Sequence, residues 1–269
     1  LMIQRPGFLR GSDRHFVMIY GGDGMEIYRN TIEFEVYGDY ALFSDPVTRV
    51  GGEKSTYHIP TYEALKGIVE SIYWKPTIMW IVDKVRVMNP IQTETKGIRP
   101  LGYNGGNELA YYTYLKKVRY QVRAHFIFNM NHEELALDRN EHKHHNIAKR
   151  MVKRGGRRDV FLGTRECQAF VEPCVFGEGK GFYDDMEGEL GYGFMYHGIT
   201  YADEAILPEE KNKMIVNFWK PVMRKGGIID FLRPEQCEYK RYIKDMPVKV
   251  FGENQFTGLF EFDNEEVED

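Results

Sequence analysis

The sequence predicts an α+β protein in which a ferredoxin-like N-terminal domain precedes a smaller β-rich C-terminal domain. Between residues 31 and 173 the hydrophobic pattern runs strand, helix, strand, strand, helix, strand, which is the element order of a ferredoxin-like fold. Beyond Pro173, short apolar runs alternate with glycine and proline turns, as in small β-rich domains. The 269 residues are 42% hydrophobic and 28% charged, a typical globular composition, and no apolar run reaches membrane-spanning length.

The first elements follow from side-chain periodicity. Residues 31–38 (TIEFEVYG) alternate apolar and polar side chains and predict a half-buried strand. Residues 60–74 place apolar side chains on one helical face, so we expect a helix there, with Trp74 in the core. Residues 77–88 (TIMWIVDKVRVM) predict a second strand, and the Gly- and Pro-rich residues 89–107 predict a long loop.

The second half of this domain repeats the pattern. Residues 118–128 alternate strictly, and four polar side chains are expected to face outward: Arg119, Gln121, Arg123 and His125. A helix follows within residues 138–154 and ends at the Gly155-Gly156 pair, and residues 166–173 supply one more strand. Such a sheet is RRM-like, because its open face is of the kind on which RNA-recognition domains stack bases.

Four segments are expected along the chain. They are an N-terminal extension of unassigned function (1–27), the ferredoxin-like domain (28–173), the β-rich domain (174–251) and an acidic tail (252–269). The tail carries seven acidic and no basic residues. The three cysteines are odd in number and lack CxxC spacing, so they predict buried free thiols in a reducing compartment and a cytoplasmic location.

Positive charge is concentrated in one segment. Residues 139–158 contain eight lysines and arginines and one acid, Glu141, for a net charge of +7. The whole chain has a net charge of −4, so the other residues carry −11. This distribution predicts a focused site for an anion such as phosphate. The alternative is a solvated basic helix face, although the arginines continue beyond the helix into a glycine turn.

Three histidines, His142, His144 and His145, lie in this basic segment. Their spacing suits a metal site, but such sites recruit further Cys, His or carboxylate ligands, whereas the neighbours here are lysines and arginines that repel a cation. The sequence therefore predicts no metal and no cofactor. We expect His142 and His145 to be exposed polar residues at the start of a helix.

Lys143 and His144 fit the cleavage of an RNA phosphodiester without a metal. This reaction needs a base for the 2′-hydroxyl, an acid for the 5′-oxygen and a cation for the phosphorane-like transition state. Histidine transfers protons near neutral pH, and lysine supplies a point charge. The positive end of a helix dipole would add to the attraction of a phosphate.

The glycine turn after this helix is a second candidate site. Paired glycines let the backbone approach a ligand closely, and arginines grip phosphates with two hydrogen bonds. The alternative is a helix stop in which Arg158 pairs with Asp159. We expect an RNA-binding surface made of the turn and the basic residues around it: Arg139, Lys149, Arg150, Arg154, Gly155, Gly156, Arg157 and Arg158.

Other candidates are less specific. Arg119 and Arg123 follow three tyrosines in residues 111–114, an aromatic and basic region that suits RNA or, equally well, packing at a sheet edge. The acidic residues within 184–187 are expected to lie in a solvated loop rather than in a metal site. His197 is expected to pack within a sheet.

Four stretches resemble a known family. They are VYGDYALFSDPVTRVGGEKSTYHIPTYEALKGIVESIYWKPT, IQTETKGIRP, DRNEHKHHNIAKR and KRGGRRDVFLGTRECQAFVEP. Together they resemble the CRISPR-associated repeat-processing endoribonuclease of the Dvulg, or type I-C, system, in the repeat-associated mysterious protein superfamily. The resemblance extends from about residue 28 to about residue 251, and GGRRDVFLGTREC is its most specific part.

The resemblance implies a metal-independent endoribonuclease that cuts CRISPR precursor RNA at the base of the repeat hairpin and leaves 5′-hydroxyl and 2′,3′-cyclic phosphate ends. It implies that the protein stays on the 5′ handle of the guide RNA as a subunit of the type I-C interference complex, with duplex DNA left open as a further partner. The catalytic residues of the family fall on Tyr73, Lys143 and His144. We expect His144 to transfer protons, Lys143 to stabilise phosphate charge and Tyr73 to orient or deprotonate the 2′-hydroxyl. As a base, Tyr73 would need cationic neighbours that lower its pKa.

Two other functions stay open at this point. In related interference complexes the equivalent subunit only caps the guide RNA, so a non-catalytic RNA-binding subunit is the main alternative. A metal-dependent nuclease of the adaptation machinery would need a carboxylate cluster, which the sequence lacks. His142 and His145 flank the Lys-His pair, and either is a candidate to replace His144.

Overall fold

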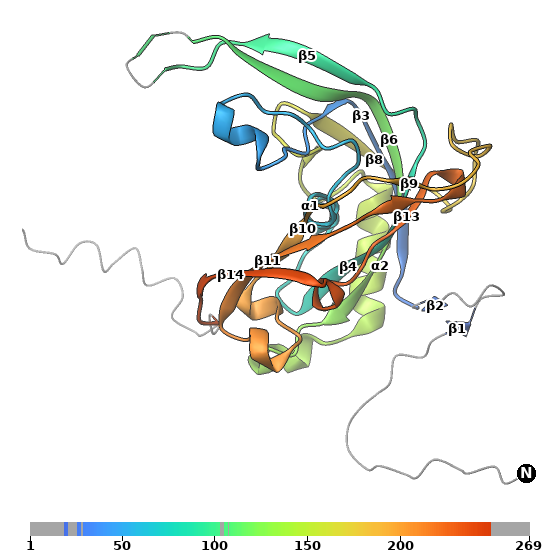
Figure 1. The fold of residues 1–269 in the computed structure, drawn as a ribbon. Helices are drawn as coiled ribbons and strands as arrows, with labels where there is room; N and C mark the ends of the chain where they lie inside the picture. Colours follow the sequence, from blue (N-terminus) through green and yellow to red (C-terminus); the bar gives the residue numbers. More distant parts are fainter. Residues whose placement is uncertain (1–18, 21–25, 28, 103–104, 107, 249–269) are drawn as a thin grey trace, which may run out of the picture.

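The computed structural model describes residues 19–20, 26–27, 29–102, 105–106 and 108–248. The expected acidic tail lies outside these residues. So does most of the expected N-terminal extension, in which Ile19–Tyr20 (β1) and Glu26–Ile27 (β2) pair as a small antiparallel ribbon. Figure 1 shows a mixed α/β fold in which helices lie among mainly antiparallel strands, and the described residues form two α-helices. Within the described residues, no helix has the length and apolar character needed to cross a membrane.

A seven-stranded sheet forms the centre of the structure. Its order is β13-β4-β6-β3-β8-β7, with β5 paired to β6, and every pairing is antiparallel. The four inner strands and their bounds are β3 (Ile32–Ala41), β4 (Ile78–Val87), β6 (Ala110–Phe128) and β8 (Gln168–Pro173). The strands added to them are β5 (Thr93–Ile98), β7 (Val160–Phe161) and β13 (Ile228–Asp230).

Helices α1 (Tyr62–Ile72) and α2 (Glu141–Lys153) contribute to one apolar core with this sheet. Because side chains alternate along a strand, every second residue of β3 and β6 points into this core. Phe34 and Val122 are fully buried there together with Leu65 of α1. Burying one such side chain stabilises the fold by about 1.5–3 kcal/mol. The predicted strands and helices of residues 31–173 are therefore all present.

The segment after Pro173 covers part of the opposite face of the sheet. The Phe176 amide donates to Glu33 Oε2 at 3.0 Å, and the Gly177 amide donates to Gln121 Oε1 at 2.9 Å. Gln121 is 3% exposed, and His125, which lies on the same strand, is fully buried. The expectation that these two side chains face solvent is wrong. The Gly177 amide lies on Gln121, and His125 Nδ1 lies 2.9 Å from the Asp83 carboxylate of the neighbouring strand.

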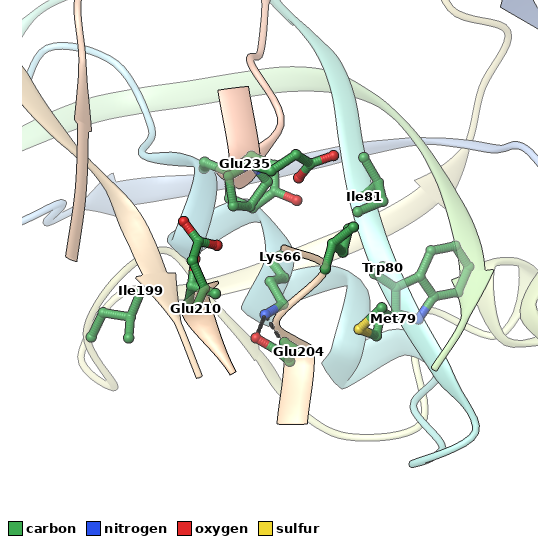
Figure 2. A pocket seen from close by; sticks show the side chains of 12 residues that line it. Lys66, Met79, Trp80, Ile81, Ile199, Glu204, Glu210 and Glu235 are labelled. Atoms are coloured by element: carbon green, nitrogen blue, oxygen red, sulfur yellow. Dashed lines mark hydrogen bonds and ion pairs between the residues drawn. The ribbon is translucent and has the colours of Figure 1, made fainter. Parts of the chain in front are cut away.

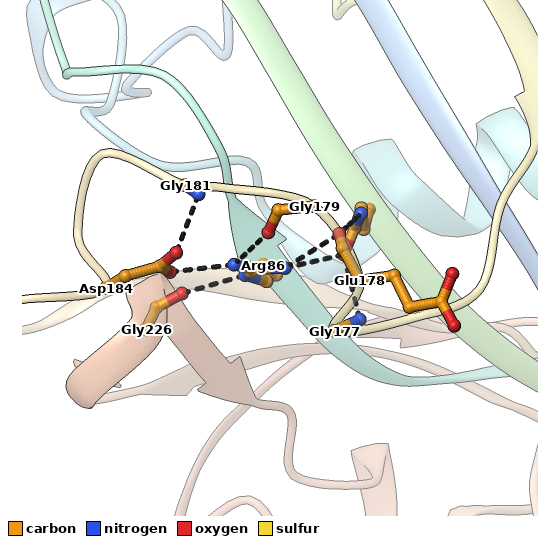
Figure 3. Close-up of polar contacts among 8 residues, drawn as sticks. Arg86, Gly177, Glu178, Gly179, Gly181, Asp184 and Gly226 are labelled. Carbon is orange, nitrogen blue, oxygen red and sulfur yellow. Dashed lines mark hydrogen bonds and ion pairs between the residues drawn. The ribbon is translucent and has the colours of Figure 1, made fainter.

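Buried Arg86 ties this segment to the sheet (Figure 3). Its guanidinium donates to the carbonyls of Glu178 and Gly179 at 3.1 and 2.9 Å and forms an ion pair with Asp184 at 2.7 Å. It also donates to the Gly226 carbonyl at 3.1 Å. One side chain thus satisfies several loop carbonyls that would otherwise be left without a partner. The acidic loop expected to be solvated is partly engaged here through Asp184.

The remaining strands lie beyond Pro173. They are β9 (Leu190–Gly191), β10 (Met195–Thr200), β11 (Lys213–Trp219), β12 (Val222–Met223) and β14 (Tyr239–Asp245). Strands β10, β11 and β14 form a three-stranded sheet, and the described helical segments of this part are short 3₁₀ turns. The division of the chain at residue 173 stays a prediction, and β13 adds to the seven-stranded sheet from beyond that point.

His197 packs within this part, as expected. Its ring stacks on Tyr62 with centroids 4.4 Å apart, and its Nε2 donates to the Leu232 carbonyl at 2.8 Å. Burial lowers the pKa of His197 to about 4, so this histidine stays neutral at neutral pH. It is a structural side chain packed between Tyr62 of α1 and Trp219 of β11.

Two local predictions are wrong. Residues 93–98, expected to be loop, form β5 against residues 110–115. Backbone pairing and cross-strand polar contacts, such as that of Thr95 with Thr113, support a strand whose side chains are largely polar. Trp74, expected in the core, is 44% exposed, because the chain leaves α1 at the preceding residue. The cysteines are free thiols, as expected; Cys167 and Cys237 are buried and Cys174 is half-buried.

Candidate functional site

Tyr73 stands where α1 ends. Its backbone is extended (φ −159°, ψ 126°), and its amide still donates to the Val69 carbonyl at 2.9 Å. The indole of Trp80 donates to the Tyr73 carbonyl at 2.7 Å, which fixes the residue against β4. Tyr73 is 3% exposed, so its side chain points inward from the helix end.

Helix α2 presents Lys143 and His144 in its first turn. Asn140 caps the helix, because its side-chain oxygen accepts from the Lys143 amide at 3.0 Å. Consecutive residues of a helix point about 100° apart. As a result, the Lys143 side chain is 47% exposed, whereas His144 is fully buried against Phe126 and Phe128 of β6.

Tyr73 and His144 are in direct contact. The Tyr73 hydroxyl lies 2.8 Å from His144 Nδ1, and His144 Nε2 lies 2.8 Å from the Asp138 carbonyl oxygen. A carbonyl only accepts, so Nε2 carries the proton, and the neutral ring therefore accepts at Nδ1 from the tyrosine hydroxyl. The fold joins two residues that are 71 positions apart in the sequence.

Asp138, which was not among the predicted site residues, completes the cluster. Its carboxylate accepts from the Lys143 ammonium and, at 2.7 Å, from the Thr77 hydroxyl. One carboxylate oxygen also lies 3.5 Å from His144 Nε2. Burial alone would raise the pKa of Asp138, but the hydrogen bonds from Lys143 and Thr77 outweigh burial and hold that pKa below its ordinary value. Its position just before the helix cap is the only sequence signal that marks it.

The surroundings of Tyr73 favour its protonated form. Burial raises the pKa of Tyr73 above its ordinary value of 10, the Asp138 charge raises it further, and Arg157 opposes both. The condition for Tyr73 to act as a base, a pKa lowered by cationic neighbours, is therefore not met. In this structure Tyr73 is a hydrogen-bond donor to His144 rather than a phenolate base.

The glycine turn packs directly on the end of α1. Gly155 and Gly156 have φ values of 86° and 110°, which side chains other than glycine rarely adopt. This turn lets the Arg157 and Arg158 amides donate to the Ser71 carbonyl at 3.2 and 3.1 Å. Both arginine side chains are exposed, beside the carbonyl end of the helix that carries Tyr73. No ion pair joins Arg158 to Asp159 among the described residues.

The other basic residues of this segment divide into two groups. Lys149, Arg150 and Arg154 are exposed on or just after α2. Arg139 is half-buried and donates to the Asn129 and His132 carbonyls at 3.3 and 2.9 Å, so it holds the turn before α2 together. The segment therefore offers exposed cations next to the Tyr73–His144 pair, with Arg139 partly used by the fold.

The flanking histidines differ from each other. His142 is exposed, as expected. His145 is half-buried; its Nε2 donates to the Thr31 carbonyl at 3.0 Å, and burial lowers its pKa. The described residues contain no group of three or more His, Cys, Asp or Glu side chains placed to hold a metal ion.

Arg119 and Arg123 lie on the sheet face that the helices do not cover, so the fold does not bring them to Tyr73. Arg119 forms an ion pair with Glu35 at 2.6 Å, and Arg123 forms one with Glu33 at 2.8 Å. The Arg123 guanidinium also lies over the Phe176 ring, 4.8 Å from its centroid. These two arginines belong to a different surface.

A separate buried cluster links α1 to the C-terminal part of the chain (Figure 2). Lys66 forms an ion pair with Glu204 at 2.6 Å at the edge of a small cavity. Burial raises the pKa of nearby Glu70 to about 7. Because the Lys66 charge is buried together with its partner, this cluster is most simply a structural connection between the two parts.

Comparison with known proteins identifies the family of this chain. Residues 31–230 match the family model described as CRISPR-associated protein (Cas_Cas5). The chain is 28% identical over 169 residues to the CRISPR pre-crRNA endoribonuclease Cas5d of Mannheimia succiniciproducens, covering 54% of this chain and 68% of the relative. It is 27% identical over 187 residues to the protein of the same name from Thermus thermophilus, covering 66% and 77%.

Two solved structures share the fold. One is a functionally uncharacterized protein from Streptococcus mutans, with 36% identity and a TM-score of 0.64, and the match covers 78% of this chain and 96% of that chain. The other, described as a CRISPR-associated protein, has 33% identity and a TM-score of 0.63 over the same shares. Since the family model spans most of the chain, the chain belongs to the Cas5d family of CRISPR-associated proteins.

Proposed function

We propose that this protein is an endoribonuclease that cuts CRISPR precursor RNA at the base of the repeat hairpin by attack of the neighbouring 2′-hydroxyl. The observation that carries this proposal is the contact of Tyr73 with His144 beside the exposed ammonium of Lys143. Two curated relatives are named pre-crRNA endoribonucleases. The exposed arginines of the glycine turn lie next to this contact and suit an RNA backbone.

Proton transfer in the proposed reaction runs through Tyr73. The 2′-oxygen forms a bond to phosphorus and gives its proton to the Tyr73 oxygen, while the tyrosine proton passes to His144 Nδ1. The nearby Asp138 carboxylate stabilises the resulting imidazolium. The bond from phosphorus to the 5′-oxygen breaks, and this oxygen takes a proton from solvent. His144 later releases the proton that it accepted to solvent. The products are a 2′,3′-cyclic phosphate and a 5′-hydroxyl.

Lys143 acts on the phosphate in this scheme. Its side chain is 47% exposed, so the ammonium can turn from Asp138 towards the phosphate and offset the charge of the transition state. Tyr73 is 3% exposed, so the bound RNA has to open a path to its hydroxyl. Protonated Tyr73 serves this relay better than a phenolate would, because it already donates to the base.

The fold supports two further parts of the proposal. Strands β8, β3, β6 and β4 lie side by side in this order, and the two helices share one core with them, which is the arrangement of a ferredoxin-like domain. We assign residues 28–173 to that domain and residues 174–251 to the β-rich part. After cutting, the protein remains on the 5′ handle of the guide RNA as a subunit of the interference complex.

The test is cutting of a cognate repeat hairpin RNA by the purified protein in excess chelator. A matched hairpin carries one 2′-deoxy nucleotide just 5′ of the cut. We expect the first RNA to be cut and the second to stay intact. If both are cut, attack by the 2′-hydroxyl is ruled out.

The competing function predicts a different result. A subunit that only caps the guide RNA would bind the hairpin without cutting it, even with all three residues intact. A metal-dependent nuclease would cut only when the chelator is left out. Binding measured on the same samples separates an inactive subunit from a misfolded one.

A further inference from the structure

A groove of about 730 Å³ lies on the face of the central sheet that the helices do not cover. It runs across β3, the middle of β6 and β8, and its lining includes Tyr37, Lys117, Arg119 and Phe170. Along β6, Arg119 is seven residues from Phe126, whose ring packs on His144, or about 23 Å in a strand. The groove is therefore separate from the proposed cutting site.

Three of its residues form one row across neighbouring strands. Phe170 of β8 is paired with Tyr37 of β3, and Tyr37 is paired with Arg119 of β6. Residues paired in this way put their side chains on the same face of a sheet. The Tyr37 and Phe170 rings lie 5.8 Å apart, and Phe170 is 57% exposed. The row offers two aromatic planes and a planar cation to a flat ligand.

The polar groups around this row indicate which kind of ligand the groove can bind. The Tyr37 hydroxyl donates to Glu172 at 2.7 Å, and Arg119 pairs with Glu35. Asp39 and Glu166 add carboxylates to the lining of the groove. Carboxylates repel a phosphate that enters the groove but accept hydrogen bonds from amino groups. The chemistry suits a base that carries an exocyclic amino group, with its phosphate held outside the groove.

The rim of the groove has an unusual backbone. Lys117 adopts a φ of 49° inside a 19-residue strand, a conformation that costs energy for a residue with a side chain. The Lys117 carbonyl accepts a hydrogen bond from the side-chain amide Nδ2 of Asn89 at 2.7 Å, which supports this conformation. The Lys117 side chain is exposed at the rim, where its ammonium can meet a phosphate.

We propose that this groove binds an unpaired nucleobase of single-stranded RNA, stacked on Phe170 and Tyr37, with preference for adenine, cytosine or guanine over uracil. This proposal rests on the proposed function in one respect only: the bound single-stranded RNA would be part of the RNA that the protein processes. Since the groove lies far from Tyr73, it would hold a part of the RNA away from the bond that is cut. Aromatic stacking with a cation beside it is the common basis of single-strand binding.

The first test uses fluorescein-labelled pentamers of adenylate, cytidylate and uridylate, titrated with the full chain and followed by fluorescence anisotropy. The adenylate and cytidylate pentamers should bind more tightly than the uridylate pentamer. Phe170→Ala should weaken adenylate binding roughly 5- to 100-fold, and Phe170→Trp should retain it. The matched control is Phe194→Ala, which removes an aromatic ring of similar exposure, 55%, from another surface.

The second test reports stacking directly. A trinucleotide with a central 2-aminopurine, which carries an exocyclic amino group, should lose fluorescence on binding the parent protein but not on mixing with Phe170→Ala. Equal pentamer affinity of Phe170→Ala and the parent overturns the proposal, as does an equal loss in Phe194→Ala. Circular dichroism of each variant identifies any misfolding.

These tests are independent of cutting. If the protein cuts the hairpin but its pentamer binding ignores Phe170, the groove proposal is wrong and the proposed function stands. If pentamer binding depends on Phe170 but no cutting occurs, the groove proposal is supported and the nuclease proposal is wrong.

Discussion

Replacing Tyr73 with phenylalanine removes one hydroxyl group and tests the proposed proton relay. The hydroxyl is the donor to Nδ1 of fully buried His144, so Tyr73→Phe leaves that nitrogen without its partner. An unsatisfied buried polar group costs about 1–3 kcal/mol. For a protein of this size we expect the melting temperature to fall by about 2–10 °C.

The effect on cutting should be much larger than the effect on stability. A residue that passes a proton in the transition state contributes roughly 10²- to 10⁴-fold to the rate. Single-turnover cutting of a repeat hairpin at saturating protein, well below the melting temperature, measures this rate. RNA affinity should change little, because the charges that attract the RNA are unchanged.

Tyr239→Phe is the matched control, since Tyr239 is 44% exposed on the C-terminal sheet, away from the site. Its cutting rate should stay within about twofold of the parent rate, as for most surface changes. A folded Tyr73→Phe protein that cuts at the parent rate would refute the relay. A rate loss that disappears on cooling would instead indicate a purely structural role.

Three further outcomes follow from the structure. Asp138→Asn removes the carboxylate charge that stabilises the His144 imidazolium in the proposed reaction, so single-turnover cutting should fall on the order of tenfold, about the value of one charge-assisted hydrogen bond; an unchanged rate would show that Asp138 has no role. Gly156→Ala places a side chain on a residue with a φ of 110°, with the new Cβ 3.1 Å from the Arg158 carbonyl oxygen. This change should lower the free energy of unfolding, measured with urea, by about 1–3 kcal/mol. The control Gly67→Ala, on the exposed face of α1, should not lower it. The pKa of His197 is about 4 in the folded protein and 6.5 in the unfolded chain. Between pH 4 and 6.5 the unfolded chain therefore binds more protons, so the free energy of unfolding should fall as the pH falls from about 6.5 to 4. His197→Gln should flatten this slope in urea unfolding, and an unchanged slope would assign it to other groups.

The predicted strands and helices of residues 31–173 follow from alternation and helical periodicity, which record burial on one face. The errors arise where a second segment changes the burial. Residues 93–98 were predicted to be a loop because their side chains are mostly polar, yet their backbone pairs with that of residues 110–115. Gln121 and His125 were expected to face outward, but both are buried, and the segment after Pro173 covers Gln121. Local patterns contain no information about such distant partners.

The candidate site was likewise predicted only in part. The chemistry of Lys143 and His144 follows from their residue types in a basic segment, and Tyr73 follows from the family resemblance. Asp138 was missed, because its role depends on Thr77 and on the ring direction of His144. The sequence also indicated no direction for the Tyr73 pKa, since this direction is set by burial and by Asp138. The RNA-binding roles of the basic residues stay predictions.

The sequence by itself determined the order of the main elements, the basic segment and the candidate catalytic side chains, because residue type and spacing set these properties locally. Only the tertiary structure decided that Tyr73 meets His144 across 71 residues and that Arg119 and Arg123 lie on another face. It also decided that Tyr37, Phe170 and Arg119 form one row. The physical reason is that strand register and helix packing place distant residues together, and both depend on contacts summed over the whole chain.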